Sequence, residues 1–413
     1  MSVLKRTQIM FLILTIATSL PLSNATLPKP PQMQQFETEE DMLRAYMIEG
    51  YTYEKMLLCL SLYHSITWSV RKLKQRLKSF NLYRRKHMTP LPIVEDKIKE
   101  ELTGPNSNVG YREMWRTLQR KYKLVVARNK VMEILRRLDP HGSEKRRTRR
   151  LQRRIYISDG PNFTWHMDGF DKLKPYGFAI HGAVDGFSRR VMWLEVCATN
   201  NDPAVIAGYY LNCIEQMEGI PKNLRTDPGT ENSTTAAIQT VFSVNELSHR
   251  FVTSVRNQRI EAWWSYFKRN KAQWMMDYFS DLYSVGIYNP DNRFQKSCFQ
   301  FCFMNILQKE LESTALAWNS HRIRPNTGSC PAGIPNEIYF LHDLYSKSDF
   351  KQPINQDQIN NMRVNTKPKK LCDDNDVEEY LEYVKSFADW DEPSDFDSAL
   401  KQYLRLMRLS GEN

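Results

Sequence analysis

The sequence predicts a mixed α/β domain preceded by all-helical modules. Residues 37–142 place apolar side chains at helical spacing. From Ile155 onward, short stretches rich in β-branched and aromatic residues alternate with helical patterns. The hydrophobic content of 41% and the charged content of 25% are typical of a folded protein, and 413 residues suffice for two or three domains.

Residues 1–25 form a leader with a basic start, an apolar run from Ile9 to Leu22, and the small residues Ser23 and Ala25 spaced like a cleavage site. This pattern is typical of a secretory signal peptide, and the run is too short to span a bilayer comfortably. A wrongly assigned first exon and an accidental apolar leader are the other interpretations. No second apolar stretch reaches spanning length, so we expect no membrane span.

The net charge of +11 is distributed unevenly. Residues 371–413 contain twelve Asp and Glu against four Lys and Arg, a net of −8, which leaves +19 for residues 1–370. A basic body of this kind fits a polyanion-binding protein and, equally, a merely soluble basic protein. The acidic C-terminal tail, residues 371–413, is expected to be a solubilising segment or a disordered segment that binds a partner or inhibits the protein itself.

Seven widely spaced cysteines do not indicate a disulfide framework. Cys298 and Cys302 are four residues apart, but no second Cys or His pair completes a zinc site. We therefore expect both to be apolar core residues of a helix.

Residues 37–90 predict a first helical module. The short break "YHSITW" separates two helices, and the second helix surrounds its apolar stripe with basic residues. A short turn followed by a basic helix is the outline of a helix-turn-helix, whose second helix enters the major groove of DNA. Arg71 and Lys74 are then the expected DNA contacts. An ordinary helical hairpin with solvated charges is the alternative.

Residues 91–142 predict a second helical module, with one helix over Ile93–Leu102 and two more separated by a break near Tyr122–Val126. A basic linker, residues 143–160, follows, and seven of its ten residues from 145 to 154 are Lys or Arg. Such a block is typical of a phosphate-contacting or nuclear-targeting segment. The DNA contacts expected there are Arg146, Arg147, Arg149 and Arg150.

The third region begins with a predicted three-stranded meander, "FTWHMD", "FAIHGAVD" and "RVMWLEV". A helix follows, with Asp202 as its expected N-cap and Gly219 at its end. Two short strands, "NLRTD" and "HRFVTSV", are each followed by a helix, over Ser233–Ser243 and from Asn257 onward. The predicted order is βββαβαβα, a mixed α/β layer structure.

Three carboxylates fall at the ends of these elements. Asp168 ends the first strand, Asp227 ends the fourth, and Glu261 lies in the first turns of the last helix. If the first and fourth strands are neighbours, the three side chains converge and repel one another unless a cation lies between them. Hard divalent ions, Mg²⁺ (or Mn²⁺), suit oxygen ligands, and two ions about 3.5–4 Å apart support phosphoryl transfer. The alternative for Asp227 is a turn aspartate before "PG".

Several motifs resemble the catalytic core shared by retroviral integrases and DDE transposases: "WHMDG", "AVDGFSRRVMWLEV", "RTDPGTEN" and "NQRIEAWWSYFKRN". The segment "WNSHRIRPNTGSCPAGIPNEIY" is similar to the one that closes this core, and the chain also resembles integrase core-domain proteins encoded in animal genomes. The resemblance implies an RNase H-like fold over residues 161–340, with a mixed five-stranded sheet and flanking helices. It also implies that Asp168, Asp227 and Glu261 are the catalytic triad and the metal ligands, with Asp168 shared between two ions.

Around Glu261, Asn257 and Lys268 are spaced to share its helix face. In the family that the sequence resembles, this face lines the DNA path. The resemblance therefore implies that Asn257 and Lys268 contact DNA, with Arg269 next to them.

Five further residues near these motifs receive structural interpretations. We expect Trp263 and Trp264 to pack in the core, with base stacking as the less favoured alternative. Asp185 falls on a structural turn of the family's pattern. Glu231 is expected to cap the following helix, and His166 to be a packing histidine, with support of Asp168 as the alternative.

The chain also departs from the retroviral pattern. No His/Cys zinc-binding spacing precedes the predicted core, and no SH3-like barrel is evident after it. Instead, residues 91–142 are similar to the helical DNA-binding module that precedes the core of bacterial insertion-sequence transposases.

The favoured hypothesis is a DNA integration or transposition enzyme, a polynucleotidyl transferase with two divalent ions. A domesticated, transposase-derived DNA-binding protein without catalysis is the second, and an RNase H-like nuclease that cuts without joining is the third. The resemblance implies DNA as partner, a homo-oligomer on DNA ends and no small-molecule substrate. It also implies a nuclear location, which conflicts with the signal-like residues 1–25.

Overall fold

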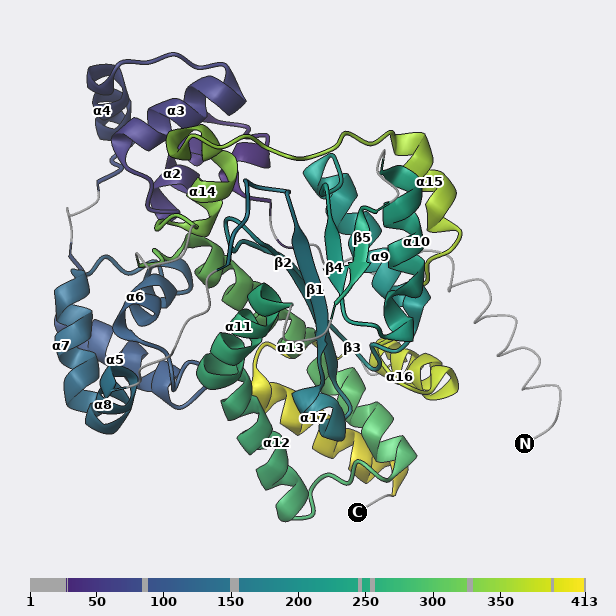
Figure 1. Ribbon diagram of the computed structural model, residues 1–413. Helices are drawn as coiled ribbons and strands as arrows, with labels where there is room; N and C mark the ends of the chain where they lie inside the picture. The colour runs from purple at the N-terminus through teal and green to yellow at the C-terminus, as the bar shows by residue number, and fades with distance from the viewer. Residues whose placement is uncertain are drawn as a thin grey trace.

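The computed structural model describes residues 27, 29–83, 88–148, 156–243, 247–252, 257–324, 330–387 and 390–411, without the side chains of 145–148. Figure 1 shows a β-sheet flanked by helices on both faces, with two N-terminal helical units beside it. The predicted leader, residues 1–25, lies outside the described residues, as do residues 149–155 of the basic linker. No helix in the described ranges combines the length and apolar character needed to cross a membrane.

The first helical unit packs three helices around one apolar core. Its second helix ends at Ser65, which has a left-handed backbone with φ 55°, and the side chain of Ser69 caps the third helix by accepting a hydrogen bond from the Lys72 backbone. The break between these helices lies where the sequence predicts it. The elements are η1 (Pro31–Met33), α2 (Glu39–Ile48), α3 (Tyr53–His64) and α4 (Val70–Ser79).

The second helical unit has its own apolar core, in which Ile98, Met114 and Val131 are fully buried. The break predicted near residues 122–126 separates its second and third helices. The elements are α5 (Leu91–Leu102), α6 (Tyr111–Arg120), α7 (Arg128–Leu138) and α8 (Pro140–Thr148).

Both helical units are docked on the sheet domain through hydrogen bonds. In the first unit, the Tyr63 hydroxyl donates to the Phe340 carbonyl at 2.5 Å. The second unit accepts a bond from the sheet domain, because the Tyr266 hydroxyl donates to the Glu113 carboxylate at 2.5 Å. The two units are therefore held next to the predicted catalytic region.

The sheet has five strands in the order β3-β2-β1-β4-β5. The first three strands form the predicted antiparallel meander, and β4 and β5 join the other edge of β1 in parallel. This mixed sheet confirms the predicted fold class. The strands are β1 (Trp165–Phe170), β2 (Ala179–Asp185), β3 (Val191–Cys197), β4 (Leu224–Thr226) and β5 (His249–Phe251).

The two faces of the sheet bury different side chains, because successive residues of a strand point to opposite faces. Trp165, Met167 and Leu224 pack under α9 (Pro203–Met217) and α10 (Ser233–Phe242). Phe170 and its neighbours on β2 and β3 pack under the helices that follow β5. Figure 1 shows these two helical layers on either side of the sheet. The even-numbered residues of β1 thus face the layer that contains Glu261.

The single long helix predicted after β5 is interrupted. It consists of α11 (Gln258–Phe267), a π-helical segment (Lys268–Ala272) and α12 (Gln273–Ser284). Such π-helical insertions inside α-helices are frequent at functional sites. The next helix, α13 (Arg293–Ser320), buries both Cys298 and Cys302 in the core, as predicted, and all seven cysteines of the chain are buried and free.

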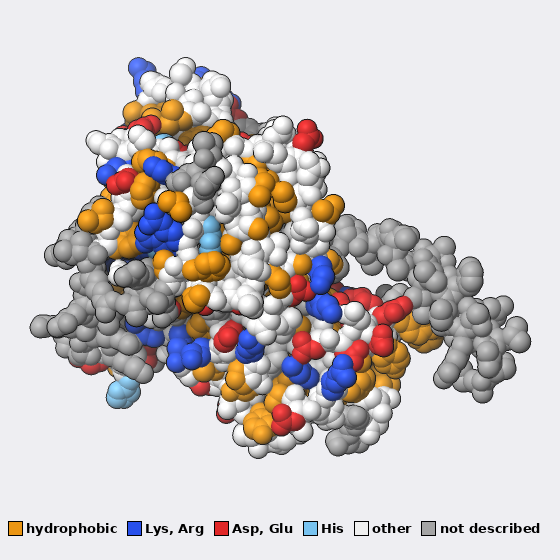
Figure 2. Space-filling view, turned by 45° about the vertical axis from the view of Figure 1, so that its right-hand side comes forward, with side chains coloured by type: hydrophobic (Ala, Val, Ile, Leu, Met, Phe, Trp, Pro, Cys, Tyr) orange, Lys and Arg blue, Asp and Glu red, His pale blue; other side chains and the backbone are white. Residues whose placement is uncertain are grey.

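The C-terminal segment is folded over residues 371–387 and 390–411, so the prediction of a disordered tail is wrong there. Its last two helices pack on α13 and bury Leu381, Phe396 and Tyr403 in the same core as the sheet. In Figure 2, acidic and basic side chains lie mixed over the lower part of the molecule. The remaining elements are η2 (Asp171–Tyr176), η3 (Thr230–Asn232), α14 (Pro335–Phe340), η6 (His342–Tyr345), α15 (Gln356–Arg363), α16 (Asn375–Phe387) and α17 (Phe396–Ser410).

Candidate active site

Asp168 and Asp227 lie side by side on one face of the sheet. The parallel pairing of β1 with β4 aligns His166 with Arg225, and each acid is two residues beyond that pair. Because the side-chain period of a strand is two, both acids point to the same face as His166 and Arg225. This is the face covered by α11.

Glu261 reaches the same place from α11, which packs against β1 and β2. Burial, and then the charges of Asp227 and Glu261, raise the pKa of Asp168 to about 7. Burial, and then the charge of Asp227, raise the pKa of Glu261. The three carboxylates are therefore close enough to act on one another electrostatically.

Two side chains orient the strand-end acids. The Trp264 indole donates to Asp168 Oδ2 at 3.2 Å, and the Asn232 amide donates to Asp227 Oδ1 at 2.7 Å. Sequence reasoning missed both roles. The available signals were that Trp264 follows Glu261 by one helical turn and that Asn232 ends the motif "RTDPGTEN".

A buried chain of hydrogen bonds anchors the start of α11 to β1. The Asn257 amide donates to the Met167 carbonyl at 3.0 Å, and its oxygen lies 2.8 Å from His166 Nδ1. The other ring nitrogen of His166 lies 2.8 Å from the Tyr156 hydroxyl. Burial lowers the pKa of His166 to about 3, so the ring is neutral. The Tyr156 hydroxyl therefore donates to Nε2, and Nδ1 donates to the Asn257 side-chain oxygen.

This chain gives Asn257 a role different from the predicted one. Its side chain is 1% exposed, and both ends of its amide bond inside the protein. It is thus not placed to contact DNA, but it ties the helix of Glu261 to the residue before Asp168. His166 is fully buried and hydrogen-bonded at both ring nitrogens, as expected for a packing histidine, and its partners are Tyr156 and Asn257.

Comparison with known proteins agrees with this geometry. Residues 155–348 match the family model described as integrase core domain. This protein contains an integrase core domain. The matched region spans the whole sheet and its flanking helices up to α14, and it places the domain in the RNase H-like superfamily of DDE transposases and retroviral integrases. No curated protein matches the chain.

The donor set of the integrase core domain suits a divalent cation, since Mg²⁺ and Mn²⁺ prefer carboxylate oxygens. Within the described ranges, however, no three His, Cys, Asp or Glu side chains are gathered closely enough to hold a metal ion as they stand. Their mutual repulsion, seen in the raised pKa of Asp168, favours separated carboxylates. The residues fit a cation if the carboxylates draw closer together around it.

The other predicted DNA contacts are only partly described. Lys268 and Arg269 are half-exposed in the π-helical segment directly after α11. Arg71 and Lys74 are exposed on α4, where the Lys74 ammonium lies 5.6 Å from the centre of the Tyr53 ring. The contacts predicted in the basic linker lie outside the described side chains: Arg146, Arg147, Arg149 and Arg150.

The structural interpretations of nearby residues hold for three positions and fail for one. Trp263 and Trp264 are buried in the core. Asp185 is fully buried, and its carboxylate accepts hydrogen bonds from the backbones of Asn162 and Ser188. Glu231 does not cap α10, which begins without a side-chain cap hydrogen bond; its carboxylate instead lies over Gly229.

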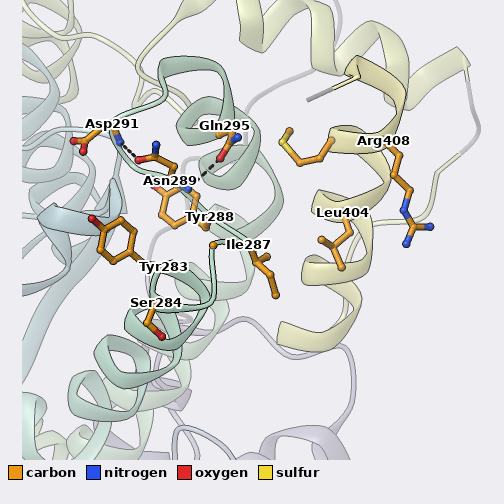
Figure 3. A pocket seen from close by; sticks show the side chains of 11 residues that line it. Tyr283, Ser284, Ile287, Tyr288, Asn289, Asp291, Gln295, Leu404 and Arg408 are labelled. Carbon is orange, nitrogen blue, oxygen red and sulfur yellow. Dashed lines mark hydrogen bonds between the residues drawn. The ribbon is translucent and has the colours of Figure 1, made fainter. Parts of the chain in front are cut away.

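A cavity of about 750 Å³ lies away from these acids, between the loop that joins α12 to α13 and the helix α17. Figure 3 shows Ile287 on one side of it and Leu404 on the other. None of the three predicted catalytic acids lines this cavity. The acids lie instead on the sheet face under α11.

Proposed function

We propose that this protein is a divalent-metal-dependent polynucleotidyl transferase that cleaves and joins DNA strands, of the integration or transposition type. The observation that carries the proposal is the position of Asp168 on the central strand, where burial and then the charges of Asp227 and Glu261 raise its pKa. An integrase core domain with three interacting acids at these elements supports phosphoryl transfer.

Asp168, Asp227 and Glu261 would hold the cations, two Mg²⁺ or Mn²⁺ ions. When bound, such ions activate the attacking oxygen and stabilise the leaving oxygen of a phosphodiester. Trp264 and Asn232 would hold the two strand-end carboxylates in place, because each donates a hydrogen bond to one of them. The buried tie through Asn257 would keep α11, and with it Glu261, at a fixed position relative to β1.

The DNA would run over the face that contains the acids. Lys268 and Arg269 follow α11 directly, and Arg71 and Lys74 are exposed on α4. Basic side chains that contact phosphates supply most of the affinity of DNA-binding proteins. We therefore propose that the exposed basic side chains of α4 contact DNA phosphates. The basic residues 146, 147, 149 and 150 remain predicted DNA contacts.

The test is a nicking and joining assay on duplex oligonucleotides with Mg²⁺ or Mn²⁺, using Asp168→Asn as the matched inactive variant. We expect the wild-type protein to cut and join strands at least 10³-fold faster than the variant, because electrostatic stabilisation supplies most of such catalysis. Cutting without joined products would identify a nuclease instead. Equal activity of both proteins would overturn the proposal.

The second candidate function is that of a transposase-derived DNA-binding protein without catalysis. One observation favours it: the described acidic side chains are not gathered into a metal-holding group as they stand. In that case duplex DNA binds equally well to the wild-type protein and to Asp168→Asn, and neither protein shows metal-dependent cutting.

We further propose a nuclear protein that acts as a homo-oligomer on DNA ends. The DNA-directed function supports the location, and the pairing of two DNA ends supports the oligomer. Tagged full-length protein should enter the nucleus with and without residues 1–25. Secretion that depends on residues 1–25 would contradict this location, and a monomer in sedimentation with DNA ends would contradict the oligomer.

A further inference from the structure

A second cavity, of about 570 Å³, lies beside the candidate active site, between β4, β5 and the start of α11. Arg225 and Arg250 line it, together with Tyr156 and Gln258. Arg225 lies on β4 and is two residues before Asp227, which follows the end of this strand, so about 6–7 Å of extended backbone separates the two residues.

The two arginines are neighbours across the sheet. The parallel pairing of β4 with β5 aligns Arg225 with Arg250, so their side chains leave the same face about 5 Å apart at the backbone. Neither guanidinium has a hydrogen-bond or ion-pair partner in the described part of the chain. Like charges directly opposite each other on neighbouring strands destabilise a sheet. A pair left without a counter-ion therefore indicates a site for an anion.

A third arginine, Arg259, lies next to Tyr156, one of the residues that line the cavity. The Arg259 guanidinium lies 4.0 Å from the centre of the Tyr156 ring, and its terminal nitrogen lies 2.8 Å from Cys330 Sγ. Among the described residues, no carboxylate forms an ion pair with the Arg259 guanidinium, whose contacts are the Tyr156 ring and Cys330. Arg225 and Asp227 are two residues apart in the chain, so their side chains leave the same face of the sheet. The cavity and the acids are therefore two adjacent, oppositely charged parts of one face.

We propose that Arg225 and Arg250 form a binding site for a backbone phosphate of the DNA strand that enters the candidate active site. Guanidinium groups bind phosphate through paired, charge-assisted hydrogen bonds, and two of them side by side match one phosphate. A phosphate held there would position the phosphodiester at the neighbouring acids. This inference rests on the proposed function for the identity of the polymer, and the arginine pair itself is independent of catalysis.

The experiment measures binding of a short duplex oligonucleotide by fluorescence anisotropy in EDTA, so that it does not depend on catalysis. We expect Arg225→Gln/Arg250→Gln to weaken binding about tenfold at low salt and to reduce the slope of log K against log[salt] by about 1. The control is Arg293→Gln at the start of α13, whose side chain is 82% exposed and which does not line the cavity.

Three outcomes are decisive. An equal loss for Arg293→Gln would show a general charge effect and overturn the site. Unchanged DNA affinity with loss of inorganic-phosphate binding would show an ion site that is unrelated to DNA, and would also overturn it. If the double variant binds DNA more weakly than the wild type, and the wild type does not cut DNA, the phosphate site is supported and the proposed catalysis is not. Thermal melting should show no loss of stability in the double variant, because it removes two like charges.

Discussion

Among single residues, Asp168 is the one of the three acids whose pKa is raised to about 7. Its pKa of about 7, against an ordinary value of 3.8, comes from burial and from the two neighbouring carboxylates. The folded state therefore binds this proton more tightly than the unfolded state. The protonated carboxyl group of Asp168 therefore stabilises the folded state at low pH. This contribution to the free energy of unfolding is lost as the pH rises from about 4 through 7.

Replacing Asp168 by asparagine should remove this loss. In EDTA at pH 8, we expect Asp168→Asn to raise the free energy of unfolding by about 1–3 kcal/mol, and at pH 4.5 by less than about 0.5 kcal/mol. Urea denaturation at the two pH values measures the difference. If Asp168→Asn changes the free energy of unfolding equally at both pH values, the ionised carboxylate of Asp168 does not destabilise the folded protein.

Trp264 and Trp263 offer a matched pair of variants. The Trp264 indole donates to Asp168, whereas the Trp263 indole nitrogen has no hydrogen-bond partner in the described structure. Because the bond from Trp264 favours the charged carboxylate, Trp264→Phe should weaken Mn²⁺ binding about three- to tenfold at pH 7. Titration calorimetry should show a smaller effect at pH 9 and none for Trp263→Phe. Equal effects of both variants would assign the loss to packing.

Among elements, α11 shows how one helix serves both packing and chemistry. Its buried face packs Ile260, Trp263 and Phe267 on the sheet, and its first turns bring Glu261 to the acids. The Asn257 side chain fixes this helix to β1. The π-helical segment that follows Phe267 contains Lys268 and Arg269.

The tie through Asn257 predicts a specific pattern of defects. Asn257→Ala removes the hydrogen bonds to the Met167 carbonyl and to His166 Nδ1, so we expect it to cost about 1–3 kcal/mol of stability and most of the joining activity. DNA affinity should stay within twofold of the wild type. Ser265→Ala, at an exposed position of α11, is the control. A lower DNA affinity without a loss of stability would restore the predicted DNA contact.

For the whole molecule, the acidic C-terminal segment is part of the integrase core-domain fold unit. It packs on α13, which in turn lies against β3, so its helices and the sheet share one apolar core. The net charge of this segment drew attention to its acidic residues, whereas its buried apolar residues determine where it lies.

Two tyrosines in this segment test its structural role. Tyr403 is fully buried against α13, and Tyr380 on α16 is 53% exposed. Tyr403→Ala should lower the free energy of unfolding by about 3–5 kcal/mol, because it removes a large buried side chain. Tyr380→Ala should change it by less than about 0.5 kcal/mol. If thermal or urea unfolding is unchanged in Tyr403→Ala, the segment is not part of the core.

The sequence by itself determined the elements and the fold class. Local patterns predicted the meander, the breaks between helices and the N-cap at Asp202, because spacing and capping depend on nearby residues. Motif order likewise singled out Asp168, Asp227 and Glu261.

Only the tertiary structure decided what each side chain contacts. It buried Asn257 against Met167, aligned Arg225 with Arg250, and packed the acidic tail on α13. Strand pairing and helix docking join residues that are far apart in the chain, and no local pattern records those distances. The residues of the candidate site could therefore be predicted, but their supporting partners could not.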